Sequence, residues 1–218
     1  MDAIIYGKNP RLGLFSGIHG DERGITTSVK KAVFKYKTAL DSFVFIPECS
    51  PSAVKLGTRR NAEGIDLNRN FIKNPKSKEA QELISLIANF AFTLCVDFHE
   101  DVELPGVYVY DSDNREGSQL LTFFRNQVKK VAPLYSGVDD ERDETLGGKA
   151  HEGYRVSSPP TKDESGNYIY EGFLDFWALI EKKTKRWITL EVPTNFPETD
   201  KDAIVDIFFR AFILEKTE

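Results

Sequence analysis

The chain has 218 residues, of which 40% are hydrophobic and 29% are charged, and its formal net charge is −5. These values are ordinary for a globular protein and exclude the disordered and fibrous classes. A negative net charge, with lysines and arginines scattered along the chain, argues against a nucleic-acid partner. The length suffices for one sizeable core, so we expect a single domain over residues 1–218.

The cysteines and the N-terminus bear on the cellular compartment. Cys49 and Cys95 lie in apolar runs, where a free thiol behaves as a small hydrophobic side chain, and two cysteines cannot build a disulfide framework. Residues 1–6 lack the features of a signal peptide, and no run approaches the roughly 18 apolar residues of a membrane span. We therefore expect a cytoplasmic protein without a membrane partner. The oligomeric state stays open.

Strand and helix patterns alternate along the first part of the chain. Short apolar runs predict strands at residues 3–6, 12–18 and 43–46. Apolar residues at helical spacing predict a helix over 26–40. The segment 50–74 is rich in Pro, Gly, Asn and Arg and is predicted to be a loop. Loops of this length are usually functional or disordered, and the density of Arg and Asn favours function.

The alternation continues through the rest of the chain. The same criteria predict helices at residues 78–90, 117–131, 173–180 and 202–214, and strands at 92–98, 107–110 and 187–192. The segment 139–172 is acidic and rich in Gly, Ser and Pro, and we expect extended, loop-dominated chain there. This order of elements predicts an α/β fold with three layers, α/β/α.

Polar groups stand at the ends of two predicted strands. His19 and Glu22 follow the apolar run 12–18, and His99 follows the run 92–98. Ligand sites in open α/β sheets gather at the carboxyl ends of strands, and two histidines with one glutamate match the ligands of a catalytic zinc. A lone histidine at a strand end is more often a hydrogen-bonded structural residue. Because two of the chain's three histidines occupy such places, the pattern favours one bound metal ion.

Glu191 interrupts an otherwise apolar strand at residues 187–192. Burial raises the pKa of a carboxyl group, and a raised pKa suits a group that takes a proton from water and passes it on. The alternative is an ion pair between Glu191 and an arginine of the loop.

The predicted loop 50–74 concentrates arginine and asparagine. Three arginines fall within the eleven positions 59–69, and three asparagines accompany them in the same loop: Arg59, Arg60, Asn61, Asn68, Arg69 and Asn70. Arginine binds carboxylates through two parallel hydrogen bonds, and asparagine adds a directed donor. The loop is therefore consistent with an anionic substrate, and a solvated basic loop is the alternative.

Four motifs together resemble the zinc carboxypeptidase family in order and content. They are His19-Gly20-Asp21-Glu22, the segment Arg-Arg-Asn-Ala-Glu-Gly-Ile-Asp-Leu-Asn-Arg-Asn-Phe at 59–71, Asp97-Phe98-His99, and Thr189-Leu190-Glu191. The match spans residues 12–192, nearly the whole chain. The resemblance implies a three-layer fold around a mixed, twisted sheet. It also implies one zinc ion held by His19, Glu22 and His99.

The resemblance further implies roles for the arginine-rich segment and the late glutamate. Asn68 and Arg69 would hold the terminal carboxylate of the substrate. Arg59 would polarise the scissile carbonyl and stabilise the oxyanion, with Arg60 as the alternative. Glu191 would act as general base and then as general acid.

A tyrosine about twenty residues before the catalytic glutamate closes over the substrate in related enzymes. Tyr170 lies 21 positions before Glu191 and is our choice, with Tyr168 as the alternative. His151 has no counterpart in the family that we can match, so we place it outside the metal ligands.

The chain departs from the digestive carboxypeptidases, because it is much shorter and lacks their disulfides and a recognisable pro-segment. It resembles the small bacterial members, including murein tripeptide amidases that cut a γ-D-glutamyl bond to diaminopimelate. We therefore expect a zinc-dependent carboxypeptidase or amidase that acts next to the free carboxylate of a small peptide or amino-acid derivative. An aspartoacylase-like N-acyl amino acid deacylase is one alternative, disfavoured because only 27 residues follow Glu191. A catalytically silent module that binds carboxylates is the other.

Overall fold

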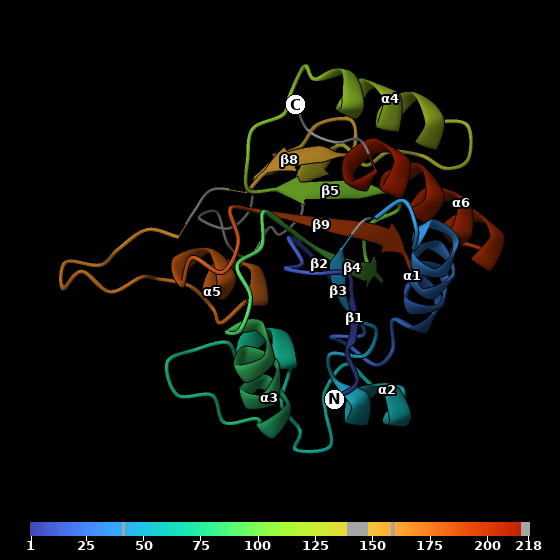
Figure 1. Ribbon diagram of the computed structural model, residues 1–218. Helices are drawn as coiled ribbons and strands as arrows, with labels where there is room; N and C mark the ends of the chain where they lie inside the picture. Colours follow the sequence, from blue (N-terminus) through green and yellow to red (C-terminus); the bar gives the residue numbers. More distant parts are fainter. Residues whose placement is uncertain (41, 139–147, 158–159, 215–218) are drawn as a thin grey trace. The chain divides into compact units, whose positions relative to one another are not determined.

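A computed structural model describes residues 1–40, 42–138, 148–157 and 160–214 (Figure 1). Seven strands form one sheet in the order β1-β3-β2-β4-β9-β5-β8, and β6 pairs with β7. The strands are β1 (Ile4–Tyr6), β2 (Leu12–Ser16), β3 (Phe43–Ile46), β4 (Leu94–Asp101), β5 (Tyr108–Asp111), β6 (Gly137–Val138), β7 (Lys149–Ala150), β8 (Tyr154–Val156) and β9 (Arg186–Pro193). Both parallel and antiparallel pairs occur, so the predicted α/β class with a mixed sheet is confirmed.

Six α-helices accompany these strands in the described residues. They are α1 (Arg23–Tyr36), α2 (Pro51–Leu56), α3 (Lys78–Ile87), α4 (Gln119–Val128), α5 (Leu174–Ile180) and α6 (Glu198–Phe208). A 3-10 turn at Leu67–Arg69 and a π-helical turn at Phe209–Ile213 complete the set. No helix in this part of the chain combines the length and the apolar character needed to cross a membrane.

The chain divides into two compact units. Unit 1 consists of Met1–Arg23, Ser42–Asp97 and Ser158–Trp187, and unit 2 of Gly24–Asp41, Phe98–Ser157 and Ile188–Glu218. Strands β4 and β9 contribute residues to both units. The single domain expected over residues 1–218 therefore stays a prediction.

Unit 1 is built on strands that are buried at successive positions. β3 pairs antiparallel with β1 and parallel with β2. Phe15 of β2 stacks on Trp187 with ring centroids 5.3 Å apart, and Leu83 of α3 and Leu174 of α5 join the same apolar cluster. Leu14, whose side chain alternates with that of Phe15, is also fully buried. Cover on both faces of a sheet is what a three-layer arrangement requires.

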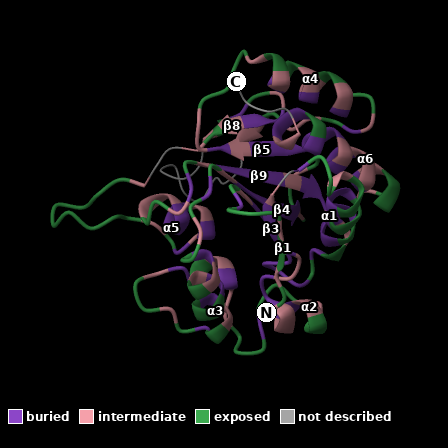
Figure 2. Ribbon diagram, in the orientation of Figure 1, coloured by how far each residue is buried: buried purple, intermediate pink, exposed green. Residues whose placement is uncertain are grey.

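Unit 2 has an aromatic core. Phe98 of β4 stacks on Phe209 with centroids 5.9 Å apart, and Phe124 of α4 meets the edge of Phe208 of α6 at 6.2 Å. Within the same unit β5 pairs antiparallel with β9 and parallel with β8. Figure 2 shows β5 and β9 as buried, whereas α4 carries exposed residues along one side. This agrees with the amphipathic spacing from which α4 was predicted.

The segment predicted as a loop at residues 50–74 contains the helix α2. Pro51 stands at its first position, and Gly57 ends it with a φ of 69° and an N–H bond to the Ala53 carbonyl of 2.7 Å. Proline at the start and glycine after the end are typical helix signals. The prediction of loop alone was wrong because α2 has six residues and one fully buried side chain, too few for a periodic pattern.

The segment predicted as loop-dominated chain at residues 139–172 also contains regular structure. β8 pairs with β5, with Tyr154 opposite Val109, and Tyr154 is 2% exposed. The described residues of this segment are nevertheless mostly loop, as predicted. The strand β8 itself was not predicted, because a three-residue strand is stabilised by a distant partner strand rather than by its own sequence. Residues 139–147 and 158–159 lie outside the described residues.

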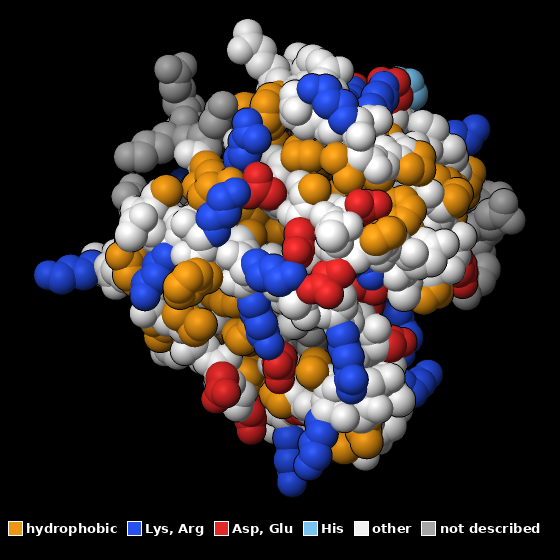
Figure 3. Space-filling model, turned by 90° about the vertical axis from the view of Figure 1, so that its right-hand side faces the viewer, with side chains coloured by type: hydrophobic (Ala, Val, Ile, Leu, Met, Phe, Trp, Pro, Cys, Tyr) orange, Lys and Arg blue, Asp and Glu red, His pale blue; other side chains and the backbone are white. Residues whose placement is uncertain are grey.

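One face of the molecule carries lysine and arginine side chains interspersed with aspartate and glutamate, as Figure 3 shows. Ion pairs of this kind include Lys31 of α1, which in unit 2 donates to Glu198 at 2.7 Å and to Asp202 at 2.8 Å. Such exposed pairs are screened by solvent and contribute little to stability. This face therefore presents no extended field of one sign.

The two thiols are expected to be unreactive in the folded protein. Cys49 and Cys95 are fully buried, and burial, together with the charge of Asp97, raises the pKa of both thiols well above its usual range. The thiolate is the reactive form, so reaction with an aromatic disulfide reagent should release almost no thiol signal from native protein. After denaturation both cysteines should react. Rapid labelling of the native chain would contradict the burial of these side chains.

Candidate metal and carboxylate site

The turn between β2 and α1 carries His19 and Glu22 and lies against α2. The Gly20 N–H donates to the Thr58 carbonyl at 2.9 Å, and a Cβ at position 20 would stand 1.8 Å from the carbonyl oxygen of Ala53. Only glycine permits so close an approach of two backbones. The close contact at Gly20 therefore fixes the position of the neighbouring His19 backbone, from which the imidazole side chain projects.

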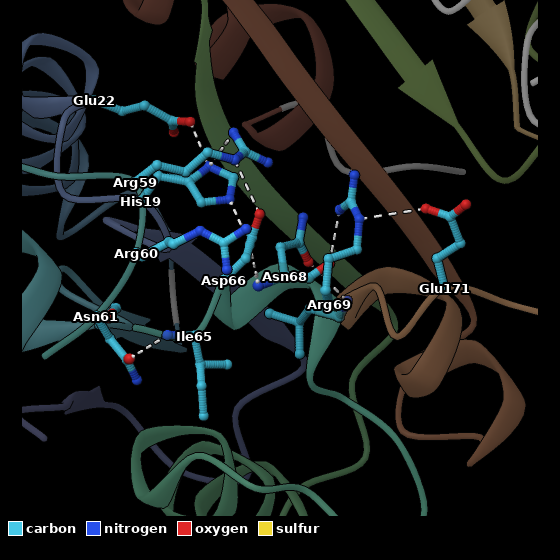
Figure 4. A network of polar contacts seen from close by, with 12 residues as sticks. His19, Glu22, Arg59, Arg60, Asn61, Ile65, Asp66, Asn68, Arg69 and Glu171 are labelled. Atoms are coloured by element: carbon cyan, nitrogen blue, oxygen red, sulfur yellow. Dashed lines mark hydrogen bonds and ion pairs between the residues drawn. The ribbon is translucent and has the colours of Figure 1, made fainter. Parts of the chain in front are cut away.

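The His19 ring is bound on both sides within unit 1, as Figure 4 shows. Its Nδ1 lies 2.5 Å from Glu22 Oε1, and its Nε2 lies 3.2 Å from Asp66 Oδ1. Asp66 Oδ2 accepts a hydrogen bond from Arg59 Nε at 2.9 Å. His19 is 3% and Glu22 is 5% exposed, so these two side chains are shielded from water. Sequence analysis assigned no role to Asp66, although it immediately precedes the turn Leu67–Arg69.

The charge of Asp66 is held in place by its surroundings. Burial alone would raise the pKa of this carboxyl group, but the hydrogen bond from His19 and the charges of His19, Arg59 and Arg69 hold it well below its usual range. Asp66 is therefore a fixed negative charge beside the imidazole. Such a partner fixes the orientation of a metal-binding histidine and raises its basicity.

His99 lies inside β4 rather than after its end, because the strand continues to Asp101. It is 3% exposed and lies in unit 2, whereas His19 and Glu22 lie in unit 1. Two imidazoles and one carboxylate are the ligand types of a catalytic zinc. All three side chains are buried, so the chemistry of this donor set fits a metal ion.

Asn68 and Arg69 lie in the 3-10 turn that follows Asp66. The Asn68 N–H donates to Asp66 Oδ1 at 3.0 Å, and Asn68 Oδ1 accepts from the backbone N–H of Leu174 at 3.0 Å. The Arg69 guanidinium lies 4.0 Å from the centroid of the Phe173 ring, and its side chain is 40% exposed. Arg69 is thus oriented by an aromatic face and accessible to an anion.

The two upstream arginines have different partners. Arg59 binds Asp66 and places its NH1 3.4 Å from His19 Nδ1. Arg60 donates to the Gly64 carbonyl at 3.0 Å. The described contacts therefore connect Arg59 with His19, whereas Arg60 stabilises the turn between itself and Gly64.

Asn61 and Asn70 hold the loop together. Asn61 Oδ1 accepts from the backbone N–H groups of Glu63 and Ile65, and its Nδ2 donates to Ser77 Oγ at 2.9 Å. Asn70 Oδ1 accepts from the Ser77 N–H at 2.8 Å. Both asparagines are buried, so their amides stabilise the loop that carries the arginines.

The tyrosines proposed to cover the substrate lie in unit 1. The Tyr170 hydroxyl donates to the Phe71 carbonyl at 2.8 Å, and burial raises the pKa of that hydroxyl. Tyr168 is 42% exposed, and Lys162 Nζ lies 4.7 Å from its ring centroid. His151, placed outside the metal ligands, is exposed in unit 2.

Glu191 lies in β9, as the sequence predicted. It is half-buried in a strand whose residues are otherwise mostly buried, and it pairs with Tyr108 of β5 across the ladder. Burial and the nearby charges of Glu191 and Asp101 raise the pKa of the Tyr108 hydroxyl, which donates to Asp101 Oδ2 at 2.5 Å.

Searches of the sequence against protein-family models and against curated proteins found no match. Solved structures do match. A candidate metallopeptidase from Shewanella denitrificans OS217 has a TM-score of 0.73 and 18% identity, over 95% of this chain and 75% of that one. A metallo-carboxypeptidase from Burkholderia cenocepacia has a TM-score of 0.66 and 16% identity, and the match covers 97% of this chain and 60% of that one. A murein-tripeptide amidase from Escherichia coli O157 has a TM-score of 0.58 and 18% identity, and the match covers 98% of this chain and 84% of that one. The chain therefore has the fold that these metallopeptidase, metallo-carboxypeptidase and amidase structures share.

Proposed function

We propose that the protein is a zinc-dependent carboxypeptidase or amidase that hydrolyses a peptide or amide bond adjacent to a free carboxylate. The observation that carries the proposal is the buried pair His19 and Glu22, whose Nδ1 and Oε1 atoms lie 2.5 Å apart in unit 1, with the buried His99 as the third donor. His19 is connected through Asp66 to Arg59. These three donors would hold one zinc ion. The fold, shared with metallopeptidases and an amidase, supports a hydrolase.

Substrate binding is assigned to Arg69 and Asn68. The guanidinium of Arg69 matches a carboxylate geometrically and stacks on Phe173, which fixes its plane. The side-chain oxygen Oδ1 of Asn68 accepts from the Leu174 N–H, so the side-chain amide is oriented and its nitrogen is the donor for an anion. A small peptide or amino-acid derivative with a free carboxylate fits these groups. The two buried free thiols fit a reducing, cytoplasmic setting.

The proposed mechanism assigns roles to three side chains beside the metal ligands. When bound, a zinc ion would lower the pKa of water and polarise the scissile carbonyl. Glu191 takes the proton and delivers it to the leaving amine. Arg59 stabilises the negative charge that develops on the carbonyl oxygen. Asp66 holds the Arg59 guanidinium and orients the imidazole of His19.

A matched substrate series tests this proposal. Peptides with a free C-terminal carboxylate should be hydrolysed, and the same peptides with a C-terminal amide should be cleaved about 10–100 times more slowly, because a charge-assisted hydrogen bond is worth about 1.5–3 kcal/mol. γ-Glutamyl peptides in the same series distinguish an amidase from a carboxypeptidase. Elemental analysis should find one zinc ion per chain, and a chelator should abolish a turnover that zinc restores.

Three outcomes would redirect the assignment. Equal rates on free and amidated peptides would remove the role of Arg69 and Asn68. Release of the acyl acid from small N-acyl amino acids, with peptides left intact, would support the deacylase. Binding of carboxylates by a chain that carries no metal and has no turnover would support the silent module.

A further inference from the structure

A carboxylate of the protein lies against the arginine to which substrate binding is assigned. Glu171 Oε2 is 3.3 Å from Arg69 Nε, and the two side chains are 51% and 40% exposed (Figure 4). Sequence analysis did not identify Glu171, because no motif marks it. Any anion that approaches Arg69 meets this second charge.

The segment that carries Glu171 is fixed to the segment that carries Arg69. The Phe71 N–H donates to the Gly172 carbonyl at 3.0 Å, and the Tyr170 hydroxyl donates to the Phe71 carbonyl at 2.8 Å. The Leu174 N–H donates to Asn68 Oδ1 at 3.0 Å. These three hydrogen bonds flank Glu171 on both sides in the sequence.

Gly172 permits the close contact between the two segments. Its φ is +81°, and a Cβ at this position would lie 2.7 Å from the backbone oxygen of Arg69. Phe173, the next residue, places its ring under the Arg69 guanidinium. The backbone therefore keeps Glu171 beside Arg69, and the weak attraction of an exposed ion pair is not needed to hold it there.

The pair presents a positive and a negative charge side by side. A ligand carboxylate that binds Arg69 is attracted by the guanidinium and repelled by Glu171. A cationic group on the same ligand removes that repulsion by pairing with Glu171. On the basis of the function proposed above, we propose that Glu171 makes this site selective for a terminal residue that carries both a free carboxylate and a cationic amino group.

The selectivity can be measured with three peptides that differ only in the last residue. Lysine supplies the amino group, norleucine has the same chain length without it, and glutamate adds a negative charge. KM should rise in the order lysine, norleucine, glutamate. In Glu171→Gln the KM of the lysine peptide should rise about two- to fivefold, and the KM of the glutamate peptide should fall by a similar factor. This is the range typical of exposed ion pairs. The kcat values should change little.

A matched control removes the same charge from an exposed loop position of the same unit. Glu164→Gln should leave the order of the three KM values unchanged. Two results would overturn the proposal. If Glu171→Gln changes all three KM values by one common factor, Glu171 only competes with any carboxylate for Arg69. If it changes none, the ion pair has no part in binding.

Calorimetric titration with Nα-acetyl-lysine and Nα-acetyl-norleucine, in which the α-amino group is blocked, gives a readout that does not require turnover. Nα-acetyl-lysine should bind more tightly to the unaltered protein, and Glu171→Gln should remove the difference. If no peptide is hydrolysed but this difference is observed, the proposed reaction fails and the selectivity stands. If peptides are hydrolysed without a preference for lysine, the reaction stands and the selectivity fails.

Discussion

Replacement of Glu191 by glutamine is expected to lower kcat on the order of 10²-fold or more, because the amide cannot accept a proton from water. Glutamine has nearly the same shape as glutamate and stays polar, and position 191 is half-buried in β9. The ladder partner Tyr108 and the fold of the strand should therefore be preserved. Steady-state kinetics on the best peptide of the series, with zinc content and melting temperature measured in parallel, test this expectation.

The exposed variant Glu164→Gln serves as the control for the loss of one negative charge. It should retain the kcat, the zinc content and the melting temperature of the unaltered protein. Near-normal turnover in Glu191→Gln would exclude Glu191 as the general base. A simultaneous loss of zinc would instead show that the substitution acts on the metal site rather than on proton transfer.

The fold could be predicted wherever a buried element reads as a continuous apolar run. The strand at 43–46 was predicted at both ends, because all four of its residues are buried and Pro47 closes it. α2 was missed because its signals are confined to Pro51 and Gly57 at its ends. β8 was missed because Tyr154 is buried by a strand remote in the sequence. Short elements of this kind depend on contacts that no local pattern records.

The metal donors could be proposed from the sequence because each lies in a short motif at or near a strand end. All three side chains are buried, which agrees with that hypothesis, and their roles stay proposals. Asp66 could not be assigned from spacing, since it meets His19 across 47 positions of the chain. Glu171 is brought to Arg69 by the hydrogen bonds around Gly172. Residues that orient or modulate a site depend on such tertiary contacts more than its ligands do.

Substitution of Asp66 by asparagine is therefore expected to weaken zinc binding by about 10–100-fold, the usual cost of losing a carboxylate behind a metal-binding histidine. Asparagine keeps the size of the side chain and an oxygen that can face His19, but it removes the fixed negative charge that raises the basicity of the imidazole. It also weakens the bond that Asp66 Oδ2 accepts from Arg59.

Competition with a chelating dye measures the zinc affinity, and kcat at saturating zinc isolates the contribution of Arg59. Asp163→Asn, an exposed change in the same unit, should alter neither quantity. Unchanged zinc affinity with a reduced kcat would assign Asp66 to Arg59 alone, whereas two unchanged quantities would remove Asp66 from the site.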